Sequence, residues 1–352
     1  MSEKEVVSLK AAVLYGMNDL RVKDVPCPQV TMDNEVLIKV GSVGVCGSDL
    51  HYYKEGKLGI FTLTQPTILG HECAGYIVEK GNEVQDLKVG DKVVVEPGTP
   101  CRKCDFCKGG RYNLCKEMTF LGTPPTNGCL VEYLKTSADS VYPISTDMTI
   151  EEGAMVEPLA VGMHAVERGS VKPGDSVAIL GCGTIGLMTL QAARLGGAIQ
   201  IIAIDVIRER LELARQLGAT EVINGSSGDT VKKVKSLTGG EGVDVTFECA
   251  GNDKTVIQCL QIVRSGGVVV LVGAPSKNIF PVNMWDCVVR EYDIRGVNTY
   301  VNIFPRAIAS IVSRRIQVKP LITHRFPLEQ ITMAYNTAYE QKEKAIKVII
   351  NF

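Results

Sequence analysis

The chain has 352 residues, with 38 Lys and Arg against 39 Asp and Glu, and a net charge of −1 at pH 7. This length is enough for two domains, each with its own core, and 45% hydrophobic and 22% charged residues are ordinary for a globular protein. The balanced charge argues against nucleic acid and against an anionic membrane surface as partners. No apolar run approaches the length of a transmembrane segment.

The start of the chain, Met1-Ser2-Glu3-Lys4-Glu5, is charged and lacks the apolar core of a signal peptide. Twelve cysteines in a long chain without such a signal indicate free thiols and metal ligands, and not a disulfide framework. We therefore expect a reducing compartment, the cytoplasm.

Residues up to about 155 are predicted to be rich in β-strands. Alternation of apolar and polar residues predicts strands over 35–40, 74–79 and 91–96, and the glycines and prolines between them predict turns. We expect this part to be a folded-over β-barrel with long functional loops.

After Met155 the pattern changes. Short apolar runs at 177–180, 201–204, 243–247 and 267–272 alternate with helical patterns, which predicts βαβ units and a parallel, doubly wound α/β sheet. Beyond about 292, the sequence predicts a helix over 304–314 and a terminal strand over 345–350.

The stretch from Gly44 to Glu72 gathers the residues best suited to chemistry. Cys46, His71 and Glu72 supply a thiol, an imidazole and a carboxylate, and each is a ligand type that Zn²⁺ accepts. Flanking glycines allow tight turns that direct these side chains to one point. The alternative is a loop with a buried cysteine and a surface histidine, which would be the better reading for Cys46 taken by itself.

Four cysteines follow at close spacing, at positions Cys101, Cys104, Cys107 and Cys115. Four thiolates at this density suit a closed tetrahedral zinc site without an open position. Two functions are possible: a structural zinc that stiffens a loop, or a zinc module that binds nucleic acid. The neutral net charge and the lack of interleaved aromatic residues favour the structural zinc.

A glycine fingerprint, Gly181-x-Gly183-x-x-Gly186, follows the predicted strand at 177–180 and opens a helix. Such glycines let the backbone approach a pyrophosphate at the positive helix end. Asp205 ends the next strand, where it can accept hydrogen bonds from ribose hydroxyls and repel a 2′-phosphate. NAD is therefore favoured over NADP, although Arg208 and Arg210 follow closely in the sequence and an arginine can bind a phosphate.

The motifs Gly44-Val45-Cys46-Gly47-Ser48-Asp49 and Gly70-His71-Glu72, together with the glycine fingerprint, resemble those of the zinc-dependent medium-chain dehydrogenases. Three further segments, His51-Tyr52-Tyr53, Glu157-Pro158 and His324-Arg325-Phe326-Pro327-Leu328-Glu329, are similar to the sorbitol (polyol) dehydrogenase branch. The resemblance extends over essentially the whole chain.

This resemblance implies a GroES-like catalytic domain of residues 1–156 and 292–352, with the structural zinc lobe at about 97–118. It implies a Rossmann NAD-binding domain of residues 157–291, inserted into the catalytic domain, which the last segment of the sequence completes. Two zinc ions per chain, NAD and a homotetramer are further implications.

The resemblance also implies a catalytic zinc held by Cys46, His71 and Glu72, with Glu157 reaching the metal directly or through its water. The alternative is that Glu157 is a carboxylate at the start of a helix, where it interacts favourably with the helix dipole. The implied reaction is oxidation of a secondary alcohol of a polyol such as sorbitol or xylitol to the ketose. Zinc acts as the Lewis acid, and nicotinamide accepts the hydride.

Ser48 and His51 are the implied proton relay, and Asp49 is a candidate partner of His71. The alternatives are a turn hydroxyl and a solvated loop histidine. The substrate-binding residues would be Tyr52, Phe120, Glu157, Thr299 and Tyr300, with Phe61 a further aromatic candidate, although single aromatics are more often core. The cofactor-binding residues would be Gly181, Gly183, Ile185, Gly186, Asp205, Arg210, Val272, Gly273, Ala274, Val297, Asn298 and Thr299.

One departure bears on the substrate. The branch usually has an arginine before the tyrosine that corresponds to Tyr300, and this chain has Thr299. The pocket has therefore lost a cation. Two alternatives remain: the same chemistry on another small secondary alcohol, such as a vicinal diol or an amino-acid alcohol, and a non-catalytic zinc-binding scaffold.

Overall fold

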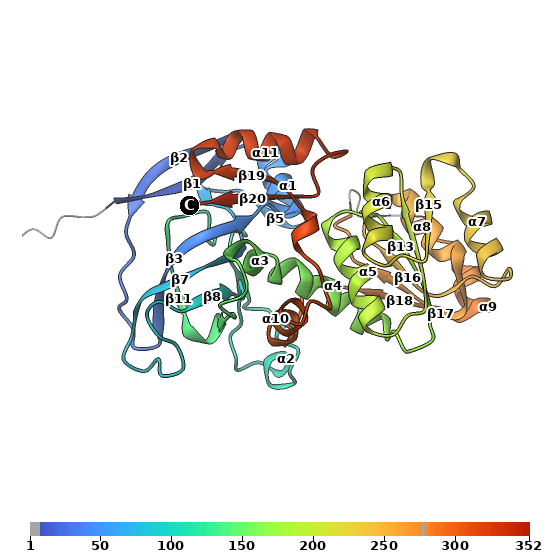
Figure 1. Ribbon diagram of the computed structural model, residues 1–352, viewed down its shortest axis with the longest axis horizontal. Coiled ribbons are helices and arrows are strands. Elements are labelled where there is room, and N and C mark those ends of the chain that lie inside the picture. The colour runs from blue at the N-terminus through green and yellow to red at the C-terminus, as the bar shows by residue number, and fades with distance from the viewer. Residues whose placement is uncertain (1–7, 276–278, 280) are drawn as a thin grey trace, which may run out of the picture. The chain divides into compact units, whose positions relative to one another are not determined.

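The computed structural model describes residues 8–275, 279 and 281–352 (Figure 1). The charged start at Met1–Glu5 lies outside the described residues. The chain divides into two compact units. The first holds the residues up to Glu157, Phe304–Val312 and Leu321–Phe352, and the second holds Pro158–Ile303 and Ser313–Pro320.

The first unit is built mainly from antiparallel strands. A seven-stranded sheet has the order β12-β8-β7-β3-β20-β19, with β11 paired to β3, and a second sheet has the order β2-β1-β6. Two small two-stranded sheets, β9 with β10 and β4 with β5, complete it. The strands are β1 (Ser8–Gly16), β2 (Asp19–Pro26), β3 (Glu35–Gly44), β4 (Lys57–Leu58), β5 (Phe61–Thr62), β6 (Thr67–Ile68), β7 (Glu72–Lys80), β8 (Lys92–Val95), β9 (Gly98–Thr99), β10 (Thr119–Phe120), β11 (Tyr133–Ser137), β12 (Val141–Pro143), β19 (Ile322–Pro327) and β20 (Lys347–Asn351).

Helices in this unit are short and cover the ends of the strands. They are α1 (Gly47–Glu55), α2 (Asp105–Lys108), η1 (Tyr112–Leu114), η2 (Ala138–Ser140), α3 (Ile150–Ala154), α10 (Phe304–Val312), η5 (Leu328–Gln330) and α11 (Ile331–Glu340). The core lies between the sheets and α11, where Leu14, Ile38, Leu69 and Tyr335 are buried. The strands predicted over 35–40, 74–79 and 91–96 are confirmed as β3, β7 and β8.

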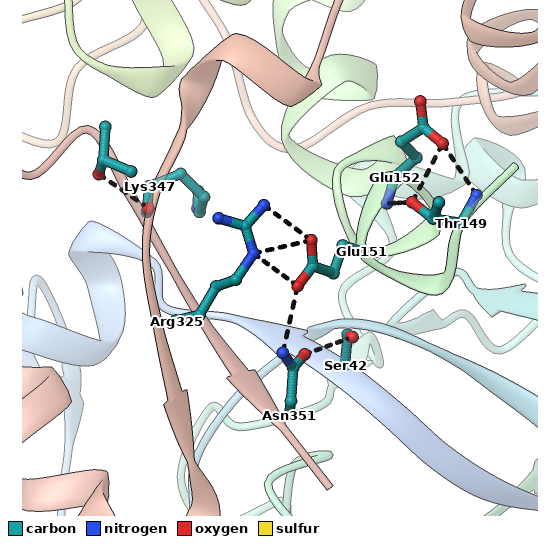
Figure 2. A network of polar contacts seen from close by, with 8 residues as sticks. Ser42, Thr149, Glu151, Glu152, Arg325, Lys347 and Asn351 are labelled. Atoms are coloured by element: carbon teal, nitrogen blue, oxygen red, sulfur yellow. Dashed lines mark hydrogen bonds and ion pairs between the residues drawn. The ribbon is translucent and has the colours of Figure 1, made fainter.

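The end of the chain returns to the first unit. Strand β20 pairs with β3 antiparallel and with β19 parallel. Figure 2 shows a polar network that fixes this return: Arg325 donates to both carboxylate oxygens of Glu151 at 2.8–3.0 Å, and Asn351 bridges Glu151 to Ser42 at 3.1 and 2.7 Å. A strand from the end of the chain thus lies beside one from its beginning.

The second unit is a six-stranded sheet of order β15-β14-β13-β16-β17-β18, in which every pairing is parallel. Its elements are β13 (Ser176–Leu180), α5 (Thr184–Leu195), β14 (Gln200–Asp205), α6 (Arg208–Gln216), β15 (Glu221–Asn224), η3 (Gly225–Ser227), α7 (Thr230–Leu237), β16 (Val243–Glu248), α8 (Asp253–Ile262), β17 (Val263–Leu271), α9 (Met284–Arg290), β18 (Asp293–Gly296) and η4 (Lys319–Leu321). Helix α4 (Val156–Gly169) begins in the first unit at Val156 and Glu157, and continues in the second.

The order of this sheet starts at β13, runs outward through β14 and β15, and then reverses to β16. That is the doubly wound arrangement of dinucleotide-binding folds, in which ligands bind at the carboxyl ends of the strands where the order reverses. The predicted α/β class is confirmed. The last strand of this sheet, β18, ends at Gly296, beyond the boundary expected at 291, and it pairs with β17 at the edge.

Among the described residues no helix has the length and apolar character that a membrane span requires.

Candidate metal centres and nucleotide-binding turn

Cys46, His71 and Glu72 come together in the first unit. One ligand atom from each lies within 4.8 Å of the others, and His71 and Glu72 are buried. The fold explains this meeting, because Cys46 follows the end of β3 and Glu72 opens β7, and the two strands pair at Gly44 and Glu72. Two antiparallel neighbours therefore bring residues 46 and 71–72 to one end of the sheet.

Asp49 organises the backbone around this cluster. Its carboxylate accepts hydrogen bonds from the N–H groups of Cys46 at 3.0 Å and Gly70 at 3.2 Å. Oδ1 lies 3.7 Å from Nδ1 of His71, which is an ion-pair distance and longer than a hydrogen bond. Burial raises the pKa of Asp49, although the neighbouring His71 opposes this rise. The predicted partnership of Asp49 with His71 is thus present as a charge contact.

The imidazole of His71 responds to this environment. Burial alone would lower the pKa of His71, but the charges of Asp49 and Cys46 outweigh burial and raise it well above its ordinary value. A metal ligand must be a neutral imidazole. Metal binding at this position therefore displaces a proton.

Lys347 of β20 lies on the other side of Glu72. Its Nζ donates to Oε1 and Oε2 of Glu72 at 2.8 and 2.7 Å and to the carbonyl oxygen of Val45 at 3.0 Å. Burial would lower the pKa of Lys347, but the charges of Glu72 and Cys46 raise it. The pair is therefore an ion pair inside the protein.

Glu157 is buried at the start of α4, outside the group of three. Its charge reaches the cluster, since it contributes to the raised pKa values of both His71 and Lys347. Its role as a metal ligand, direct or through water, stays a prediction.

The three donors fit zinc in kind and in spacing. Sulfur, nitrogen and oxygen ligands bind Zn²⁺ at roughly 2.0–2.3 Å in a tetrahedron, which puts the ligand atoms roughly 3.3–3.8 Å apart. The three atoms here lie within 4.8 Å of one another, so small side-chain movements would bring them onto one ion. Three protein ligands leave a fourth position open, which is typical of a catalytic zinc.

The four cysteines also come together. The sulfurs of Cys101 and Cys107 are 4.0 Å apart, and those of Cys104 and Cys107 are 3.5 Å apart. Zinc–sulfur bonds of about 2.3 Å in a tetrahedron put sulfurs roughly 3.8 Å apart. The lobe therefore matches a closed tetrathiolate centre, as its spacing predicted.

Backbone N–H groups of Lys103 and Cys104 lower the pKa of Cys101 to about 7, which favours the thiolate that a metal needs. Two of the cations between the cysteines form surface ion pairs, Arg102 with Asp139 at 2.6 Å and Lys103 with Glu117 at 3.4 Å. The lobe is attached to the sheet through Glu96, which accepts hydrogen bonds from Tyr112 at 2.6 Å and Tyr142 at 2.9 Å.

In the second unit the glycine fingerprint forms the turn between β13 and α5. Gly181 has φ +99°, and a Cβ on Gly186 would overlap the carbonyl oxygen of Gly181. A Cβ on Gly183 would meet only the tip of Arg210, at 3.8 Å. The tight turn thus needs its first and third glycines, and the middle one leaves open space at the amino end of α5, where a pyrophosphate is stabilised.

Asp205 ends β14 beside this turn. Its carboxylate accepts hydrogen bonds from the N–H groups of Cys182 at 2.6 Å and Ile207 at 2.9 Å, and Arg210 lies 3.9 Å from it. Arg208, by contrast, points to solvent and pairs with Glu212 at 2.8 Å. Asp205 and Arg210 are therefore the charged groups beside the turn, and their cofactor roles stay predictions.

The remaining predicted cofactor residues lie near the carboxyl ends of the central strands. Val272 and Gly273 donate to the carbonyl oxygen of Glu248, and Val297 donates to that of Leu271. Ile185 is half-buried in α5, Ala274 and Asn298 are exposed, and Thr299 has φ +48°. All of them belong to the second unit.

The predicted relay and substrate residues are divided between the units. Ser48, His51 and Tyr52 lie on α1 of the first unit, and Nδ1 of His51 is 3.0 Å from Glu55. Tyr52 is 1% exposed, and burial raises its pKa to about 12. Phe120 lies against His71 with ring centroids 5.4 Å apart. Phe61 is exposed on the β4–β5 hairpin, and Tyr300 is buried in the second unit beside Thr299.

Two residues near the metal cluster were missed from the sequence, Lys347 and Tyr335. Tyr335 of α11 is fully buried, and burial together with the charge of Asp49 raises its pKa well above normal. Lys347 carried a signal, because it is the one charged residue in the apolar run 345–350.

Comparisons with known proteins agree with this geometry. Residues 32–146 match the family model of the alcohol dehydrogenase GroES-like domain, and residues 184–313 match that of the zinc-binding dehydrogenases. A sorbitol dehydrogenase of Bacillus subtilis (strain 168) is 43% identical over 343 residues, covering 97% of each chain.

Solved structures are similar over nearly the whole chain. An Escherichia coli oxidoreductase/dehydrogenase of unknown specificity is 39% identical, with a TM-score of 0.94, covering 98% of this chain and 99% of that one. A 2R,3R-butanediol dehydrogenase of Bacillus subtilis is 32% identical, with a TM-score of 0.89, covering 98% of this chain and 100% of that one.

Proposed function

Because this chain belongs to the sorbitol dehydrogenase branch of the zinc-dependent medium-chain dehydrogenases, we propose that it is an NAD-dependent polyol dehydrogenase. It oxidises a secondary hydroxyl of a sugar alcohol, such as sorbitol or xylitol, to the ketose. The observation that carries this proposal is the meeting of Cys46, His71 and Glu72, a three-ligand set that leaves a position open for substrate.

Cys46, His71 and Glu72 would hold the catalytic zinc, with Glu157 as a further ligand or as the partner of its water. The four cysteines of the lobe would hold a second, structural zinc. When bound, zinc supplies a Lewis acid for the substrate hydroxyl, and NAD accepts the hydride. Asp49 keeps His71 oriented, since it faces Nδ1 and also fixes the backbone at Cys46 and Gly70.

The proton of the hydroxyl needs a path to solvent. Ser48 and His51 lie three residues apart on α1, which places them on the same face of the helix. His51 is half-exposed and its Nδ1 contacts Glu55 at 3.0 Å, so the relay would run from Ser48 to His51 and then to water. Replacing His51 by Gln should slow turnover at neutral pH and leave zinc content unchanged.

For the cofactor, Asp205 would accept the ribose hydroxyls and the open space at Gly183 would admit the pyrophosphate. Val272, Gly273, Ala274, Val297, Asn298 and Thr299 would line the rest of the nucleotide site. Tyr52, Phe120, Glu157, Thr299 and Tyr300 would contact substrate. Phe120 has the best geometric support, because it packs on His71.

A second substrate class is favoured by one observation. Thr299 stands where this branch usually has an arginine that binds a polyol hydroxyl, and the similar butanediol dehydrogenase carries a name that points to a vicinal diol. We therefore keep a small diol as the alternative substrate, with the same residues and the same reaction.

One experiment tests both classes. The zinc-loaded protein is assayed for kcat/KM on sorbitol, xylitol, ribitol and 2,3-butanediol, with NAD and NADP side by side, and zinc is measured on the same sample. We expect a polyol with NAD to rank first. A higher value for the diol would select the alternative, and no turnover with any alcohol combined with no saturable NADH binding would leave only a zinc-binding scaffold.

We also propose a homotetramer in the cytoplasm. All twelve cysteines, which lie within the described part of the chain, are free thiols, as a reducing compartment requires. Helix α9 exposes Met284, Trp285 and Val288 at 67%, 71% and 64%, and the strand that follows it in the chain, β18, is the edge strand of the sheet. An apolar surface next to a sheet edge suits a second copy, and light scattering of the wild type and of Trp285→Glu tests it.

A further inference from the structure

Lys347 makes contacts that the proposed dehydrogenase chemistry leaves unexplained. An ammonium group has three N–H donors, and here its three partners are both carboxylate oxygens of Glu72 and the carbonyl oxygen of Val45, at 2.7–3.0 Å. Lys347 is 3% exposed and Glu72 is 0% exposed. All three donors of the cation are therefore used, two of them by a carboxylate that is also expected to bind metal.

The backbone is built to permit this contact. A Cβ on Gly44 would overlap Oε2 of Glu72, so the glycine at the end of β3 makes room for the carboxylate. Gly44 also pairs with Ile349 of β20, which positions Lys347 beside the cluster although it lies 275 residues from Glu72 in the chain. A buried charge pair held this way costs desolvation energy on both sides, so hydrophobic packing alone does not account for it.

We propose that Lys347 competes with the catalytic metal for the carboxylate of Glu72 and thereby keeps the metal less tightly held and more exchangeable. The proposal rests on the proposed metal site at Cys46, His71 and Glu72. Lys347 is a positioning residue in this role, since it acts on the metal only through Glu72.

Two physical effects give the direction. A carboxylate has about four lone-pair sites on its two oxygens, and an ammonium that bridges both oxygens occupies one on each, so fewer are left for a metal. The positive charge of Lys347 also repels a divalent cation, and it withdraws electron density from its ligand. A hydrogen-bond partner can instead hold a ligand in position and strengthen metal binding. That opposite effect would make the Lys347 variants lose zinc faster.

The test measures zinc release from the zinc-loaded, full-length protein into an excess of a chromogenic chelator. Cys46→Ala identifies the catalytic phase, because only the lobe can hold zinc in that variant. We expect Lys347→Met to slow the catalytic phase by about tenfold, the lower end of the scale for groups that contact metal ligands. The phase of the four-cysteine lobe should be unchanged and is the internal reference.

Three further variants separate the explanations. Lys347→Gln keeps an N–H donor without the charge and should also slow release, whereas Lys347→Arg keeps the charge and should resemble the wild type. Lys344→Met removes a charge from an exposed position nearby and is the matched control.

An unchanged or faster catalytic phase in both Lys347→Met and Lys347→Gln would overturn the proposal. If instead the wild type showed a single release phase and Cys46→Ala left the zinc content unchanged, the metal site itself would be wrong, which is a different failure.

Discussion

The two metal centres of the first unit are assembled in different ways. The four cysteines of the lobe lie within residues 101–115, and their sulfurs approach within 3.5–4.0 Å over short, half-exposed turns. The other centre takes Cys46 from the end of β3, His71 and Glu72 from the start of β7, and the contacts of Lys347 from β20. A local centre needs little loop closure, whereas a distributed one exists only when the whole unit is folded.

Their charged surroundings differ as well. Around the lobe, ion pairs such as Arg102 with Asp139 are on the surface, where a pair contributes at most about 1 kcal/mol. Around the distributed centre, Asp49, Glu72 and Lys347 are all buried. The first centre is thus suited to holding a metal permanently, and the second to adjusting how a metal and its open position behave.

The largest expected effect comes from removing one thiolate from the distributed centre, which is formed by Cys46, His71 and Glu72. Cys46→Ala should lower kcat/KM by on the order of 10³-fold or more, since the Lewis acid is lost. One zinc per chain should disappear, while the far-ultraviolet circular dichroism spectrum and the thermal midpoint change little. Cys73→Ala, at a buried cysteine outside the ligand set, is the control. Full activity in Cys46→Ala would refute the ligand assignment.

Removing one thiolate from the lobe should have the opposite effect, lowering stability and leaving activity nearly unchanged. Cys104→Ala should lower the thermal midpoint by about 5–10 °C, because a lost metal ligand is among the larger destabilisations and about 1 kcal/mol shifts the midpoint of a domain this size by about 2–4 °C. Activity per folded molecule should remain near the wild-type value at low temperature. Immediate loss of activity in a still-folded protein would show that the lobe is catalytic.

Asp49→Asn tests whether a residue that supports a metal ligand affects the distributed centre and not the lobe. It keeps the backbone hydrogen-bond acceptor at one oxygen but removes the charge that faces His71. Catalytic zinc affinity should fall by about 10–100-fold, measured by equilibrium dialysis, and added zinc should restore turnover. Weaker binding in the lobe as well would mean that the substitution had disturbed the fold generally.

The smallest expected effect concerns the attachment of the lobe. Burial raises the pKa of Glu96, and the hydroxyls of Tyr112 and Tyr142 oppose that rise by donating to the ionised carboxylate. Tyr112→Phe should therefore lower the free energy of unfolding by about 1.5 kcal/mol where Glu96 is ionised. The loss should shrink as the pH falls through the raised pKa, because the protonated carboxyl needs that donor less.

Urea titrations between about pH 8 and pH 5 measure this dependence. Tyr133→Phe, on a half-buried tyrosine of β11, is the control and should show no such trend. A constant deficit at every pH would mean that packing, and not the charge of Glu96, links the lobe to the sheet.

Much of the molecule could be predicted because its signals are local. The lobe depends on the spacing of four cysteines, the turn at Gly181 on a strand followed by a helix, and the parallel sheet on short apolar runs, and each of these is a pattern within a few turns of chain. The strands at β3, β7, β8 and β13 accordingly lie where alternation and apolar runs predicted them.

What could not be predicted depends on contacts between distant segments. Lys347 belongs to an apolar strand, and nothing in positions 345–350 says that its partner is residue 72. Strand β18, which follows the expected boundary at 291, is identified by its pairing with β17 more than by its own residues. Tyr335 likewise looked like an ordinary member of an amphipathic helix, although the charges of Asp49, Cys46 and Glu72 contribute to its raised pKa.

The pairing of β20 with β3 also affects the order in which the two centres can form during biosynthesis. A ribosome makes about 5–20 residues each second, and amino-terminal parts fold as they emerge. The lobe has all its cysteines outside the ribosome while more than half of the polypeptide is still unmade, so it can take up its ion during translation. The surroundings of the other centre are complete only after Lys347 has been made and β20 has paired with β3, so that centre matures later than the lobe.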